Sequence, residues 1–150
     1  MSMINDGVTA TGEVHIELRD EHGNVKDTRH ISNLVVTLGK VFIAARMKDA
    51  AATAMSHMAV GTDSTAALVA NTTLGAEVAA SRTALTSSTL LSNTITYAAT
   101  FIAGTGTGAL VEAGVFNDGT AGTMLCRTVF AVLNKGISDS VTITWAITIN

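Results

Sequence analysis

The C-terminal segment SVTITWAITIN, residues 140–150, alternates between apolar and mostly hydroxyl-bearing side chains. Successive side chains of a β-strand point to opposite faces, so this pattern predicts a strand with one buried face and one more polar face. Branched side chains, which are frequent here, fit such a pleated surface. The predicted buried face comprises Val141, Ile143, Trp145, Ile147 and Ile149, and the opposite face carries Thr142, Thr144 and Thr148.

Four other segments are typical of strands, and glycine-rich stretches separate several of them. They are GEVHIELR (12–19), NTITYAATF (93–101), ALVEAGVF (109–116) and TMLCRTVFAVL (123–133). After the first, DEHGN supplies a turn in which Gly23 is free to adopt a positive φ. The chain then returns as a more polar strand over residues 25–31, expected at a sheet edge where its charges discourage pairing with other molecules.

Only TLGKVFIAARMKDA, residues 37–50, has the period of a helix. Its apolar residues follow the i, i+3, i+4, i+7 spacing of one helix face: Leu38, Val41, Phe42 and Ala45. Thr37 is an acceptable N-cap, so we expect one short helix over about residues 38–50. A short strand, SHMAVG, and a polar loop over residues 61–82 are expected to follow.

Short strands without a repeating strand–helix alternation predict a mainly β fold, an antiparallel β-sandwich or jelly roll with that one helix. The chain of 150 residues is long enough for one domain with a real core. The first residues, MSMINDGVTAT, are small, polar and flexible in composition. We therefore expect an N-terminal arm over residues 1–11 and a single β-rich domain over residues 12–150.

The balance of charge limits the classes of partner. Charged residues make up 14% of the chain, against roughly 25% in an ordinary soluble domain. A surface so poor in charge is expected to be partly buried against other chains. The net charge of −3 and few aromatic residues argue against nucleic acid.

No membrane span or secretory signal is expected. Lys40 and Arg46 interrupt the most apolar run, NLVVTLGKVFIAARM, which is also shorter than the roughly 20 residues that a membrane helix needs. MSMINDGVTA lacks the basic start and apolar stretch of a secretory signal, so synthesis in a cytoplasm is expected.

The segment EAGVFNDGTAGTMLCRTVF, residues 112–130, contains the most chemically suggestive residues. If NDGTAG forms a hairpin loop, Phe116 faces Thr123, and Glu112 lies directly opposite Arg127. Opposite charges in that position stabilise a strand pair by about 0.2–1 kcal/mol. Catalysis would need a second acid or a base, and this segment offers only Asp118 on the loop. We therefore interpret Glu112 and Arg127 as a structural ion pair.

The other candidate groups also favour structural roles. Cys126 alternates with Met124 and Phe130 and is expected to be a small core residue. GTGTG (104–108) and GTDST (61–65) lack the GK[ST] ending of a phosphate loop. His15 and His30 are expected to oppose each other across the first hairpin, and no Asp/Glu pattern completes a metal site with them. We expect no catalytic residues, no cofactor and no metal.

The succession of motifs resembles small virion structural proteins of tailed bacteriophages. The similar segments run from about Gly12 to the C-terminus, and EAGVFN followed by GTMLCRTVF is the most telling among them. Similar patterns occur in capsid cement (decoration) proteins and in tail-fibre or baseplate modules. The chain carries Cys126 where a small residue such as alanine is expected.

This resemblance implies a non-enzymatic cement protein that binds and stabilises the assembled head shell. Its expected partners are the major capsid protein and further copies of itself in a dimer or trimer. Its expected location is the capsid surface of the virion, after synthesis in the host bacterial cytoplasm. The N-terminal arm is a candidate capsid contact through Ser2, Met3, Ile4, Asn5 and Asp6.

Two other classes stay open. A tail adaptor, fibre or baseplate component uses similar β-rich architecture, although the chain has no long repetitive shaft. A ligand-binding β-domain would need a pocket with polar groups, and the few charged residues do not cluster in the sequence.

Overall fold

The computed structural model describes residues 7–49 and 51–150, and these form nine strands and one helix. In chain order they are β1 (Ala10–Arg19), β2 (Val25–Val35), α1 (Thr37–Lys48), β3 (His57–Gly61), β4 (Thr83–Ala84), β5 (Ser87–Leu91), β6 (Thr94–Phe101), β7 (Gly108–Phe116), β8 (Met124–Lys135) and β9 (Ser140–Ile149). The protein is mainly β, as the sequence predicts, and β4 and β5 are strands that the sequence pattern does not reveal.

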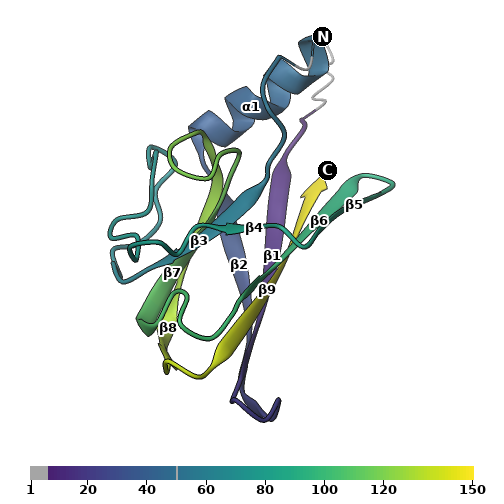
Figure 1. Cartoon of the computed structure of the whole chain (residues 1–150). Helices are drawn as coiled ribbons and strands as arrows, with labels where there is room; N and C mark the ends of the chain where they lie inside the picture. The colour runs from purple at the N-terminus through teal and green to yellow at the C-terminus, as the bar shows by residue number, and fades with distance from the viewer. Residues whose placement is uncertain (1–6, 50) are drawn as a thin grey trace, which may run out of the picture.

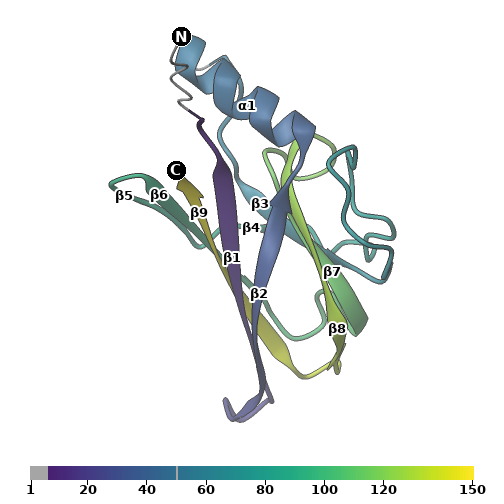
Figure 2. The same ribbon diagram turned by 180° about the vertical axis from the view of Figure 1, so that it is seen from behind.

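All strands belong to one antiparallel sheet in the order β4-β3-β7-β8-β2-β1-β9-β6-β5. β2 pairs with β1 along most of its length but with β8 only through Leu34 and Val35. The sheet curls at this narrow junction, which lies at the end that carries α1 (Figures 1 and 2). Side chains from both halves form one hydrophobic core.

β9 has the environment that its sequence predicts. It lies between β1 and β6, so apolar residues on its inner face meet those of two neighbouring strands. Trp145 is fully buried between Val14 and Tyr97 in the registers of these pairs. On the opposite face, Thr148 and Thr142 form hydroxyl hydrogen bonds to threonines of β6 at 2.9 and 3.0 Å. The alternation of β9 therefore places apolar contacts on the inner face and hydroxyl hydrogen bonds on the outer face of the sheet.

Helix α1 forms where the sequence predicts it, but the face that packs includes Phe42 of the expected face and not Leu38 or Val41. Val36 occupies the N-cap position without a side-chain hydrogen bond, so Thr37 is the first helical residue and not the cap. The helix ends at Lys48, and residue 50 of the expected range lies outside the described residues. Leu38 and Val41, expected on the inner face, are 40% and 58% exposed.

Gly39 explains this rotation of the helix. It is the buried residue of α1, and a Cβ at this position would collide with the backbone carbonyl of Leu125 in β8. The helix therefore approaches the strand backbone directly through Gly39. Phe42 and Ile43, on the same side, pack against the core.

The segment 62–82 has no strand of its own and covers the outer face of the β3–β7–β8 half (Figures 1 and 2). A second, smaller apolar cluster forms on this side, separate from the main core: Val36, Ala59, Leu74, Phe116 and Met124. Leu74 is the contribution of the segment itself. We refer to residues 62–82 as the cover loop.

Among the described residues, no helix is long and apolar enough to cross a membrane. β1 begins at Ala10, so the last two residues of the expected arm, 1–11, belong to this strand. The proposed contact residues Ser2–Asp6 lie outside the described residues.

Candidate functional site

Glu112 and Arg127 form a buried ion pair on the outer face of β7 and β8. The distance from Arg127 Nε to Glu112 Oε2 is 2.8 Å, and both side chains are buried. The expected register is wrong, because Glu112 lies opposite Val129, and Arg127 lies opposite Gly114. An irregularity between Val115 and Phe116 lies between the hairpin loop and this pair, so the ion pair is diagonal. Phe116 lies opposite Met124 instead of Thr123, so the pairing next to the hairpin loop already differs by one residue from the expected register.

The Glu112 carboxylate also anchors the cover loop. It accepts hydrogen bonds from the backbone N–H groups of Ala76 at 2.8 Å and Gly75 at 3.0 Å, with a longer one from Asp63 at 3.4 Å. A carboxylate that accepts several N–H bonds and an arginine bond is well satisfied when buried. Gly61 permits this approach, because a Cβ there would collide with the carboxylate.

Arg127 holds the middle of the same loop. Its terminal nitrogens donate to the Asn71 side-chain oxygen at 3.2 Å and to the Asp63 carbonyl at 3.3 Å. Asn71 in turn accepts from the backbone N–H of Leu68 at 2.8 Å. Hydrogen bonds from Thr65, and more weakly the charge of Arg127, lower the pKa of Asp63 below its ordinary value. One buried ion pair therefore organises contacts along most of the cover loop.

A second arginine fixes the end of the loop. The Arg82 guanidinium stacks 3.6 Å from the centre of the Phe116 ring and pairs with Glu77 at 3.1 Å. It also donates to the carbonyls of Asp118 and Ala121 at 2.8 and 2.9 Å. Arg82 thus joins the cover loop to the β7–β8 hairpin loop. Such multidentate contacts suit the planar guanidinium group.

The cover loop and α1 together present apolar side chains to solvent. The backbone N–H of Thr37, at the start of α1, donates to the Val69 carbonyl at 2.8 Å, so helix and loop adjoin. Near this junction four apolar residues are each at least two-fifths exposed: Leu38, Val41, Leu68 and Val69. We call these four residues the helix–loop surface. Exposed apolar side chains that gather on a fixed surface mark contact sites.

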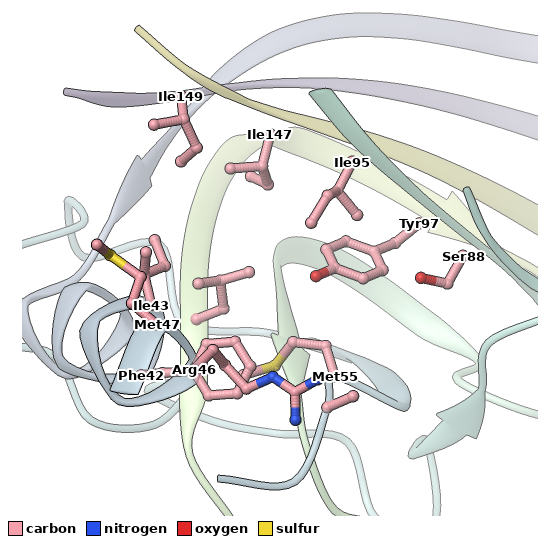
Figure 3. A pocket seen from close by; sticks show the side chains of 12 residues that line it. Phe42, Ile43, Arg46, Met47, Met55, Ser88, Ile95, Tyr97, Ile147 and Ile149 are labelled. Carbon is pink, nitrogen blue, oxygen red and sulfur yellow. The ribbon is translucent and has the colours of Figure 1, made fainter. Parts of the chain in front are cut away.

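A cavity of about 430 Å³ lies between α1 and the inner face of β6 and β9. Its walls are mostly apolar and include Phe42, Met55, Ile95 and Ile147. Figure 3 shows the hydroxyl of Tyr97 facing this space, with Ser88 beside it and Arg46 on the opposite side. Arg46 also donates to the Ala52 carbonyl at 2.8 Å.

Burial raises the pKa of Tyr97 to about 12, although the charge of Arg46 acts in the opposite direction. The phenol therefore stays protonated at neutral pH and offers a neutral hydrogen-bonding group to the cavity. A mainly apolar cavity with a few polar groups has the general character of a small-molecule site.

The remaining sequence candidates have structural positions. Cys126 is buried in the main core, and burial raises the pKa of its thiol well above the ordinary value. His15 and His30 face each other in register, with ring centroids 5.1 Å apart. GTGTG forms the β6–β7 turn, and Gly104 and Gly106 have positive φ.

Within residues 7–49 and 51–150, no group of three or more His, Cys, Asp or Glu side chains could hold a metal ion. The structure brings together two pairs of candidates that the sequence analysis names, Glu112 with Arg127 and His15 with His30. The register of the first pair differs from the one expected, and that of the second agrees with it. The sequence does not predict the cavity or the helix–loop surface, because each combines segments that are separated in the chain.

Comparison of the chain with protein-family models, with curated proteins and with solved structures finds no match. Function is therefore inferred from the residues and their geometry.

Proposed function

We propose that the chain is a non-enzymatic virion structural protein of a tailed bacteriophage, a capsid cement protein that binds and stabilises the assembled head shell. The observation that carries this proposal is the helix–loop surface, which displays two exposed apolar side chains on α1 and two on a loop held by a buried ion pair. The series of sequence motifs that resembles small virion proteins supports the same class. The expected partner is the major capsid protein.

A firmly held surface suits repeated binding to a regular lattice. Arg127 holds the cover loop at Asp63 and Asn71, Glu112 holds it at Gly75 and Ala76, and Arg82 fixes its end. Little conformational entropy is then lost when the loop binds, so more of the interaction energy contributes to affinity. A protein that binds the assembled shell better than the free subunit stabilises the assembled state by mass action.

We infer that the two halves of the curled sheet act as the layers of an antiparallel β-sandwich, with the shell contact at the end that carries α1. The arm residues Ser2–Asp6 add a second contact to the capsid, and the chain acts as a homo-oligomer on the capsid surface.

Co-sedimentation with purified expanded heads that lack this chain tests the proposed surface. Val41→Asp and Val69→Asp place a charge on the helix–loop surface, where the native side chains are 58% and 49% exposed. We expect at least about tenfold weaker binding, which corresponds to about 1.4 kcal/mol. Ile137→Asp is the matched control, because Ile137 is 72% exposed in the β8–β9 turn, at the other end of β8 from α1.

Loss of binding in the two surface variants but not in the control supports the proposal. Equal binding by all variants contradicts the proposed surface. Absence of binding by the unaltered protein contradicts the cement function itself. Deletion of residues 2–6 tests the arm separately, and unchanged occupancy of the heads would exclude its role.

A tail adaptor, fibre or baseplate component is the alternative within the same class. It would use the same exposed apolar residues against a tail protein, and its binding would be restricted to the tail or its vertex. Particles labelled with antibody and viewed by electron microscopy distinguish a covered shell from a labelled tail.

The cavity beneath α1 favours a second function, the binding of a small apolar molecule. Its volume of about 430 Å³ is within the usual range of about 300–1,000 Å³ for ligand sites. A fluorescent apolar probe should bind the protein, and Ile147→Trp should reduce that binding by filling the space. Equal probe binding by both proteins would place the probe elsewhere and remove this candidate.

A further inference from the structure

The open edges of the sheet are not equally protected against pairing with another chain. An unpaired strand edge exposes backbone N–H and C=O groups that recruit further strands, and proteins usually block it with charges or by keeping it short. At one end of the sheet, β4 contains only Thr83 and Ala84 and directly follows Arg82. This edge is too short to serve as a template.

The free part of β2 is protected by charge. Residues 25–33 lie beyond the short pairing with β8, which involves only Leu34 and Val35. Lys26 pairs with Asp139 at 2.9 Å, and Asp27 pairs with Arg29 at 2.9 Å. A strand from another molecule would have to displace or desolvate these charges.

β5 has neither form of protection. It occupies the opposite end of the sheet, and all five of its residues are exposed. The surrounding sequence TSSTLLSN, residues 86–93, contains no charged side chain. Within the described residues β5 pairs only with β6, and Leu90 and Leu91 are 70% and 78% exposed. An uncharged apolar edge of this kind is expected to be covered in the functional assembly.

We propose that β5 pairs with β5 of a second copy, antiparallel about a two-fold axis near Thr89. This register places Ser88 opposite the partner's Leu90 and Ser87 opposite the partner's Leu91. The absence of charge means that no residue faces a like charge when the strand meets itself. The proposal refines the homo-oligomer part of the proposed function.

The edges also select a dimer over a ring of three. In a ring of three copies each contact is heterologous, which means that it joins two different surfaces of neighbouring copies. β5 of one copy would therefore have to pair with a different open edge of the next copy. β4 is two residues long, and the free part of β2 is charged. The part of β8 that does not pair with β2 is also occupied, because Arg29 of β2 donates to the carbonyls of Ala131 and Val132 at 2.8 and 3.1 Å. Self-pairing of β5 therefore joins two edges of equal length and compatible chemistry.

The inner face of β5 supports the same arrangement. Leu90 is in register with Ile95, and Ser88 is in register with Tyr97, so these side chains share the inner face of the sheet. Ile95, Tyr97 and Ser88 line the cavity beneath α1. In the dimer, the two Leu90 side chains lie diagonally across the axis and continue this apolar face from one copy to the other.

Measurement of the solution mass of the isolated chain, by sedimentation velocity, tests the proposal. The unaltered protein should have twice the chain mass of 15.4 kDa. Thr89→Lys should reduce it to the monomer, because two like charges meet near the axis. Ser138→Lys adds the same charge at an exposed position in the β8–β9 turn and should stay dimeric.

A second variant gives a positive readout. Thr89→Cys should form an interchain disulfide under mild oxidation, because opposed residues of antiparallel strands have Cα atoms about 4.5–5.5 Å apart, within disulfide range. Ser138→Cys should not, and the native Cys126 is buried. A monomeric or trimeric unaltered protein, a Thr89→Lys dimer, or equal cross-linking at both positions would overturn the proposal. Binding of Thr89→Lys to heads is measured separately, so failure of the dimer and failure of the cement function are distinguishable.

Discussion

The buried pair of Glu112 and Arg127 leads to the sharpest stability prediction, because the carboxylate serves both the arginine and the cover loop. Arg127→Met leaves a fully buried carboxylate without its 2.8 Å partner. Removing one member of a buried ion pair costs about 3–5 kcal/mol. Total stability of a domain is about 5–15 kcal/mol, so this variant should unfold at a much lower urea concentration.

The double variant Glu112→Leu/Arg127→Met separates the two roles. Replacing both members of a buried pair by apolar residues is often neutral or stabilising. Here it also removes the acceptor for the N–H groups of Gly75 and Ala76. Leaving such donors without a partner costs about 1–3 kcal/mol, so the double variant should stay less stable than the unaltered protein.

Urea unfolding followed by the fluorescence of Trp145, the only tryptophan and a fully buried one, measures these differences. Amide hydrogen exchange at Gly75 and Ala76 should become faster in the double variant. Lys48→Ala is the control, because the Lys48–Asp49 pair is exposed and its loss should change stability by less than about 1 kcal/mol. A double variant as stable as the unaltered protein, with unchanged exchange, would refute the anchoring role of Glu112.

Four further predictions concern other parts of the fold. Gly39→Ala should reduce the free energy of unfolding by about 1–3 kcal/mol, and so lower the urea midpoint, because the added methyl group overpacks against β8. Alanine is the better helix former, so a rise in the urea midpoint would contradict the close contact. The hydrogen bond from Lys26, followed by that from the Gly136 N–H, lowers the pKa of Asp139, so its stabilisation is present above the ordinary carboxyl pKa and is lost as pH falls through the lowered value. Asp139→Asn should therefore be less stable than the unaltered protein at pH 7, and acid titration of thermal stability should show this difference shrinking below about pH 4. The Cys126 thiol should react with iodoacetamide only upon unfolding, because it is buried with a raised pKa; rapid labelling of the folded protein would be inconsistent with this. Tyr97, the only tyrosine, should ionise at about pH 12 in an absorbance titration of the folded protein, and ionisation near its ordinary value would contradict burial of the ring.

The sequence predicts those features of the fold that depend on local alternation. β9 and β6 have a strict period of two, and the residues that the structure buries are all inner ones; only Ile95 and Ile149 of the inner face are partly exposed. The helix between β2 and β3 is predicted to within about two residues at its described ends. The face through which this helix packs is not predicted from the sequence, because the contact at Gly39 depends on β8, which is distant in the chain.

Other features could not be predicted because their causes are not local. The irregularities in the β7–β8 pairing change its register, and the residue pattern of these strands does not indicate them. β5 has the sequence SSTLL and lacks alternation because all of its residues are exposed. The burial of Glu112 and Arg127 depends on the cover loop. The sequence sign of that burial is a charged residue among mostly apolar neighbours, Glu112 in β7 and Arg127 in the first half of β8.

The proposed function is that this chain covers the shell of a virus particle. The most direct measurement is its copy number in purified particles, relative to the major capsid protein, by quantitative mass spectrometry with labelled reference peptides. A cement protein predicts a ratio near one, or a simple fraction that icosahedral symmetry allows. A ratio far below such a fraction would assign the chain to the tail, and its complete absence from the particle would contradict the virion function.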